Sequence, residues 1–150
     1  MTYVMPEQKR TTEGLTQVCA NINILTRHIH DANVAAGWWS DGTMNNSSDA
    51  GPGNLRQPHN LKYVIPTKLA LAHSELSAAL EGFRKGLNDD HLPTRPMIEV
   101  ELADAIIRIL DIAGALNLDV GGALVEKFNY NQTRPDHKKE AREAEGGKSI

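Results

Sequence analysis

Two acidic residues, Glu101 and Asp104, have the spacing most suggestive of chemistry. They are three residues apart, so on a helix they share one face, which Arg108 and Asp111 continue. Carboxylates this close repel each other unless a positive charge lies between them. Mg²⁺ or Mn²⁺ fits that place, because hard cations prefer oxygen ligands. Spacing alone favours the alternative, a solvent-facing surface on which Asp104 and Arg108 form an ordinary ion pair.

A third carboxylate, Glu75, could supply the opposite side of such a site from another helix. It follows the almost wholly apolar run 69–72, and Glu81 lies further along the same segment. A carboxylate beside such a run is often placed for a purpose, although a solvent-facing Glu75 remains an equal alternative.

Polar residues downstream could bind phosphate. Lys127, Asn131 and Arg134 are spaced by four and three residues, which puts them on one helical face. Two cations flanking an amide would suit a triphosphate beside a metal. The alternative is a polar helix end, where basic residues interact favourably with the helix dipole.

The elements that must position these residues are helices, since apolar residues recur at helical spacing and only the short piece 61–65 alternates as a strand would. Gly37 and Gly86 are expected to end helices, Pro66 to begin one, and Asp119 to cap the last. The sequence therefore predicts an all-α fold, a bundle of four helices. The expected ranges are 12–36, 66 or 67 to 85, 97–116 and 120–131.

The second helix is expected to bury a row of mostly large apolar residues: Leu69, Ala72, Leu76, Leu80 and Phe83. On the third helix Ile106, Ile109 and Ile112 lie off the main apolar row. Because a monomer tolerates only limited exposed apolar area, we expect an oligomer.

Domain organisation is expected to be simple. Residues 1–135 form one domain with a loop over 40–60, and 136–150 form a polar tail. Trp38 and Trp39 stand just before the loop. Since adjacent residues point different ways, one could face a nucleotide base while the other is core, the alternative being that both are core.

Composition excludes several classes of protein. A net charge of −3 and a sequence pI near 6.0 argue against a basic platform for nucleic-acid polymers. Cys19 is the single cysteine, which rules out an internal disulfide and fits a reducing cytosol. The sequence has no apolar run that could span a bilayer and no signal-peptide pattern, so we expect a cytoplasmic protein without a membrane partner.

Taken together, these motifs resemble the all-α nucleotide pyrophosphohydrolases of the MazG-like type. The resemblance rests on Gly37-Trp38-Trp39, on 73–77 (HSELS), on 101–108 (ELADAIIR) and on 127–134 (KFNYNQTR), and covers most of residues 12–135. It implies a helical bundle that assembles as a homodimer or homotetramer. It also implies Mg²⁺-dependent cleavage between the α- and β-phosphates of a nucleoside triphosphate.

The family's metal ligands lie in an E-x-x-E motif on one helix and an E-x-x-D motif on the next. The second motif matches as Glu101 and Asp104, whereas the first matches only at Glu75, because Ala78 occupies its other position. Glu81, one turn further, is a candidate replacement that could reach the metal directly or through water. Glu75 is also the candidate to position water.

By the same resemblance, Lys127, Asn131 and Arg134 would contact phosphate, and Trp38 and Trp39 would lie near the base or ribose. The short chain, with Gly147-Lys148 near its end, looks most like phage members, which would work in the host cytoplasm. Among these the MazZ-like branch acts on purine deoxynucleotides, so dGTP or dATP is a possible substrate.

Two other functions fit the sequence. One is a non-enzymatic helical interaction module whose acidic faces are solvated. The other is a histidine-based metal phosphohydrolase using His28, His30, His73 and His137, although their scattered spacing matches no standard ligand pattern.

Overall fold

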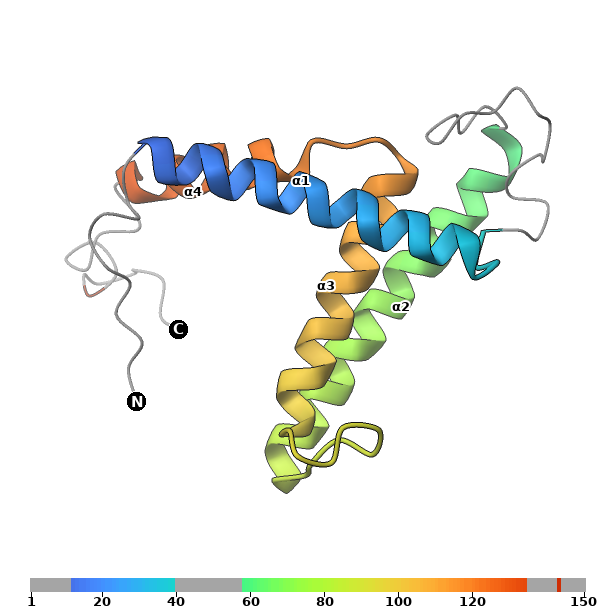
Figure 1. The fold of residues 1–150 in the computed structure, drawn as a ribbon. Helices are drawn as coiled ribbons and strands as arrows, with labels where there is room; N and C mark the ends of the chain where they lie inside the picture. Colours follow the sequence, from blue (N-terminus) through green and yellow to red (C-terminus); the bar gives the residue numbers. More distant parts are fainter. Residues whose placement is uncertain (1–11, 40–57, 135–142, 144–150) are drawn as a thin grey trace. The chain divides into compact units, whose positions relative to one another are not determined.

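The computed structural model describes residues 12–39, 58–134 and 143. They contain the helices α1 (Thr12–Ala35), α2 (Pro58–Lys85), α3 (Met97–Ala115) and α4 (Val120–Thr133), shown in Figure 1. Within these ranges there is no strand, only an isolated bridge between Asn88 and Pro96. The predicted all-α class is therefore confirmed. Most of the expected loop and tail lies outside the described residues.

Local chemistry sets most helix ends where the sequence predicted them. Gly37 and Gly86, just beyond α1 and α2, have φ values of 86° and 62°, which favour glycine. Asp119 caps α4 by accepting a hydrogen bond from the Gly122 amide at 2.9 Å. These predicted ends and the predicted cap are confirmed.

The predicted start of the second helix is wrong. The helix begins at Pro58, so the last part of the expected loop and the piece 61–65 are helical, and Pro66 lies inside the helix. A proline within a helix loses one backbone hydrogen bond and crowds the carbonyl four residues earlier, but the residues on either side can still keep the helix going. The Thr67 hydroxyl donates to the Tyr63 carbonyl at 2.9 Å in this turn.

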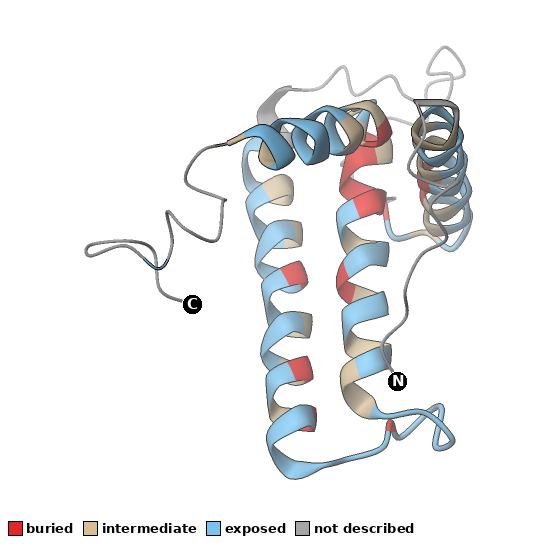
Figure 2. Cartoon of the chain, turned by 90° about the vertical axis from the view of Figure 1, so that its left-hand side faces the viewer, coloured by how far each residue is buried: buried red, intermediate tan, exposed pale blue. Residues whose placement is uncertain are grey.

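The helices α2 and α3 form a tightly packed hairpin (Figure 1). Figure 2 shows that the buried positions of α2 lie on the side that faces α3. On α2 these are the small residues Ala72, Ala79 and Gly82, which allow a close approach of the helix axes. Asp89, in the connecting turn, accepts hydrogen bonds from the amides of His91 and Leu92.

The predicted core face of α2 is wrong except at Ala72. Its large members are between 47% and 69% exposed: Leu69, Leu76, Leu80 and Phe83. On α3, Ile112 is buried, whereas Ile106 and Ile109 are exposed. Hydrophobicity alone does not distinguish a core from a surface that another chain covers, and here the small residues make the hairpin contact.

By contacts the chain divides into two units, which we describe separately. One comprises Ile24–Leu118, and the other Met1–Asn23 with Asp119–Ile150. In the first, Gly114 of α3 lets α1 come close, because a Cβ at Gly114 would lie 2.5 Å from the His30 Cβ. In the second, the Asn23 amide group donates to Asp119 at 2.7 Å, and its oxygen accepts from Gly121.

None of the helices in the described ranges combines the length and the apolar character needed to cross a membrane.

Candidate active site

Acidic side chains from both helices meet between α2 and α3. Glu75 and Asp104 both lie close enough to Glu101 to raise its pKa. Two of the carboxylates that the sequence selected thus act electrostatically on the third, on a hairpin whose small residues let the helices approach closely.

The electrostatics of this carboxylate cluster are unfavourable without a cation. Burial, the contact with Glu75 and the negative charges of Glu75, Asp104 and Asp89 all raise the pKa of Glu101. A shared proton or a positive charge relieves such repulsion. The residue types fit Mg²⁺ or Mn²⁺, which take oxygen ligands.

The cation that the structure does place there is a guanidinium. Arg108 Nε donates to Glu75 Oε1 in an ion pair across the two helices. Within the described ranges, no three Asp, Glu, His or Cys side chains are already arranged to hold a metal ion. Glu75 is thus engaged by Arg108 while remaining next to Glu101.

The first-motif position that lacks a carboxylate, Ala78, is half-buried in the hairpin. Glu81 forms ion pairs with Arg84 and Lys85 on its own helix, and its side chain is partly exposed. These contacts occupy both Glu81 oxygens and give no support to Glu81 as the replacement ligand.

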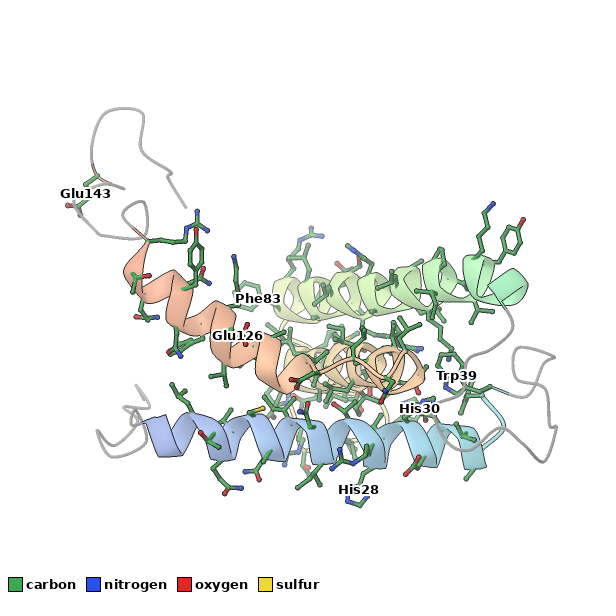
Figure 3. The ribbon with its side chains drawn as sticks, turned by 90° about the horizontal axis from the view of Figure 1, so that it is seen from above. His28, His30, Trp39, Phe83, Glu126 and Glu143 are labelled. Atoms are coloured by element: carbon green, nitrogen blue, oxygen red, sulfur yellow. The ribbon has the colours of Figure 1, made fainter. Side chains whose placement is uncertain are left out.

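A second polar cluster, centred on Asp111, adjoins the carboxylates. The buried Asp111 accepts from His30 Nδ1 and Trp39 Nε1, both at 2.9 Å, and from Lys68 Nζ at 3.3 Å. Figure 3 shows His30 and Trp39 side by side, and their rings meet edge to face. Lys68 Nζ also lies 3.9 Å from the Trp39 ring centroid, a cation–π contact.

The Asp111 carboxyl is held ionised by these donors. Burial alone would raise its pKa, but the hydrogen bonds from His30 and Trp39 and the charge of Lys68 keep the pKa below its ordinary value. Because a carboxylate only accepts, His30 Nδ1 carries the proton. Lys68, Arg108 and Asp111 line a small pocket beside the cluster.

Sequence reasoning missed this network as part of the site. Asp111 had been placed on the Glu101–Asp104 face, which was the available signal, but its partners come from distant segments. Of the histidines in the rival hypothesis, His28 and His73 are exposed and His30 is paired with Asp111. His137 lies outside the described residues.

The two tryptophans differ sharply. Trp39 is 2% exposed and Trp38 is 70% exposed, so the alternative in which both are core is wrong. Trp39 has a structural role beside Asp111. Trp38 is the exposed aromatic that could stack on a base.

The predicted phosphate contacts lie on α4 and its end, in the other unit. Lys127 Nζ and Arg134 Cζ lie 4.9 and 5.8 Å from the Tyr130 ring centroid, so this ring joins the two cations. Asn131 Oδ1 is buried without a hydrogen-bond partner among the described residues. Lys127 and Asn131 lie one helical turn apart on α4, whereas Arg134 follows the last residue of the helix and has an extended backbone.

Comparison with protein-family models found no match, and comparisons with curated proteins and with solved structures found none either.

Proposed function

We propose that this chain hydrolyses a nucleoside or deoxynucleoside triphosphate to the monophosphate and pyrophosphate, with Mg²⁺ or Mn²⁺ as cofactor. The observation that supports the proposal is that Glu75, which Arg108 of α3 pairs with across the hairpin, and Asp104 both lie close enough to Glu101 to raise its pKa. These are the positions that the resemblance to MazG-like pyrophosphohydrolases selects. These carboxylates repel one another, and a divalent cation bound between them would relieve that repulsion.

In this proposal Glu75, Glu101 and Asp104 would hold the metal, and its charge would offset that of the phosphates in the transition state. Glu75 also orients a water molecule for attack on the α-phosphorus. The bond from that phosphorus to the bridging oxygen breaks, and pyrophosphate leaves. Lys127, Asn131 and Arg134 contact phosphate oxygens, and Trp38 stacks on the base.

We further propose that the substrate is a purine deoxynucleotide such as dGTP or dATP, and that the protein works in the cytoplasm, in a host cell if it is phage-encoded. Both points rest on the resemblance of the chain to phage members of the family. Neither requires a nucleic-acid polymer or a membrane as partner.

The working form in this proposal is a homodimer or homotetramer. Exposed apolar rows run along both helices of the hairpin: Leu76, Leu80 and Phe83 on α2, and Leu102, Ile106 and Ile109 on α3. On α2, Leu76 lies four residues after the buried Ala72, and on α3, Ile109 lies four residues after the buried Ala105. Because the helices run antiparallel, this equal displacement puts both rows on one side of the hairpin. Two such hairpins pair into a four-helix bundle.

The same apolar surface favours the alternative function, a helical interaction module without catalysis. A panel of ribo- and deoxynucleoside triphosphates with Mg²⁺ or Mn²⁺ separates the two. We expect monophosphate and pyrophosphate in equal amounts from at least one nucleotide, and only with the metal. Absence of turnover across the panel, or release of diphosphate and inorganic phosphate, would contradict the proposed reaction.

A further inference from the structure

Arg108 supplies the positive charge that a bound metal would otherwise supply to the carboxylate cluster. Its guanidinium pairs with Glu75, the carboxylate that also acts electrostatically on Glu101. A carboxylate oxygen that accepts from a guanidinium at close range is poorly placed to bind a divalent cation as well, since the two positive charges repel. Metal binding through Oε1 of Glu75 therefore requires Arg108 to move.

The two partners of this ion pair differ in their freedom to move. The Glu75 side chain is 15% exposed, whereas the Arg108 side chain is 42% exposed. If Arg108 moves away from Glu75, the guanidinium charge remains in contact with water. The half-buried Glu75 would then lie beside Glu101 without a positive partner, unless another cation replaced the guanidinium. The pair is thus stable without metal and can be exchanged at modest cost when a divalent cation takes over the charge.

A new partner for Arg108 is available close by. Arg108 lines a pocket with Lys68 and Asp111. Lys68 is fixed there by Asp111 at 3.3 Å and by the Trp39 ring. Asp111 already has three donors, so it does not need Arg108 as a partner. Two cationic groups beside one satisfied carboxylate favour an anionic ligand, and a phosphate oxygen is the group that a guanidinium binds best.

We propose that Arg108 is an exchangeable counter-ion: a divalent cation displaces it from Glu75, and the freed guanidinium then binds a phosphate oxygen of the substrate beside Lys68. This inference rests on the proposed function, because it assumes metal at the carboxylates. It makes metal binding a prerequisite for full phosphate binding. The metal binds first, and the freed Arg108 then adds its positive charge to the part of the site that binds the anionic substrate.

The test is a titration of the full chain with Mn²⁺, without nucleotide, followed by the electron paramagnetic resonance of free Mn²⁺. Arg108→Met removes the charge and keeps most of the aliphatic stem. We expect it to bind Mn²⁺ about tenfold more tightly than wild type, because no guanidinium competes for Glu75. Arg95→Met is the matched control: Arg95 forms an exposed ion pair with Glu99 on the same hairpin, and its loss should leave Mn²⁺ affinity unchanged.

Melting curves provide a second readout that does not depend on activity. Without divalent cations Arg108→Met should melt below wild type, and Mn²⁺ should raise its melting temperature by more than it raises that of wild type. Arg108→Lys keeps the positive charge and is the control for a folding defect caused by substitution at this position. It should bind Mn²⁺ with nearly wild-type affinity.

Binding of inorganic pyrophosphate tests the second half of the exchange. With Mn²⁺ saturating, wild type should bind pyrophosphate about tenfold more tightly than Arg108→Met, while Arg95→Met should match wild type. Equal pyrophosphate affinity in wild type and Arg108→Met would overturn the transfer of Arg108 to phosphate.

Failure of the inference is distinguishable from failure of the proposed function. If wild type binds Mn²⁺ and Asp104→Asn does not, but Arg108→Met binds it no more tightly than wild type, the counter-ion exchange is wrong and the metal site stands. If neither wild type nor Arg108→Met binds Mn²⁺ at millimolar concentration, the metal site and the exchange are both wrong.

Discussion

Asp111 shows how one buried charge can organise several segments of the chain. Its carboxylate receives hydrogen bonds from α1, from the turn after α1 and from α2, so it joins three segments to α3. Each donor is itself buried or stacked, which makes the network costly to break. Asp111 therefore acts on stability first, and on the carboxylate cluster through Lys68 and Arg108.

Replacing Asp111 should cost stability in a pH-dependent way. Because the folded-state pKa of Asp111 lies below its unfolded value of about 3.9, ionised Asp111 contributes stability above about pH 4 that is lost as the pH falls through the folded-state pKa. At pH 7, Asp111→Asn should have an unfolding free energy about 2 kcal/mol below that of wild type. As the pH falls, the unfolding free energy of the variant should decrease less than that of wild type. Urea unfolding between pH 7 and pH 3 measures both.

The exposed Asp31→Asn serves as the charge-matched control. If Asp111→Asn and Asp31→Asn have the same stability at pH 7, the network is not what holds these segments together.

The tryptophan pair gives a second test at the residue scale. Trp39→Ala should destabilise the fold by about 3–5 kcal/mol, because Trp39 is buried against His30 and Lys68. Trp38→Ala should leave the melting temperature nearly unchanged and raise KM by about ten- to a hundredfold, the effect of losing a base-stacking contact. An unchanged KM for Trp38→Ala would place the base elsewhere.

At the scale of the helices, the small residues of α2 fix how closely α3 packs. Ala79→Leu should push the helices apart and cost about 1–3 kcal/mol of unfolding free energy. Ala70→Leu, on the exposed side of the same helix, makes the same chemical change and should cost almost nothing. Equal denaturation midpoints for the two variants would show that the hairpin contact is not tight at Ala79.

Helix boundaries were largely predictable because they depend on local chemistry. Gly37, Gly86 and Asp119 act through their own backbone or side chain, and the structure bears out all three. The start of α2 was not predictable in this way. Pro66 suits a first turn, yet the helix continues through it, because the neighbouring residues propagate a helix already begun at Pro58.

The site was predictable only in part for a related reason. Helical spacing places Glu101 and Asp104 on one face of α3. Their proximity to Glu75 depends on how α2 packs against α3. On α2 the packing surface consists of alanines and a glycine rather than the leucines. The partners of Asp111 come from segments 43, 72 and 81 residues away, and no short motif encodes such contacts.

At the scale of the whole molecule, the exposed apolar side of the α2–α3 hairpin should pair with a second copy. We expect light scattering to give a mass that is a multiple of 16.5 kDa at micromolar concentration. Leu80→Glu, in the centre of the apolar row, should shift the protein to the monomer, whereas Ala70→Glu, at an exposed position of α2 outside the row, should not. A wild-type chain that stays at 16.5 kDa would refute this assembly.

The most direct test of the central claim is the turnover of carboxylate variants with the best nucleotide of the panel. Glu101→Gln and Asp104→Asn should each lower kcat by at least about a hundredfold, the scale of removing one charge-stabilising group. Both should remain folded, because each removes one of several neighbouring negative charges. Glu99→Gln, an exposed change on the same helix, should keep wild-type turnover. Near wild-type turnover in Glu101→Gln or in Asp104→Asn would remove that residue from the site and contradict a metal-dependent pyrophosphohydrolase built on these carboxylates.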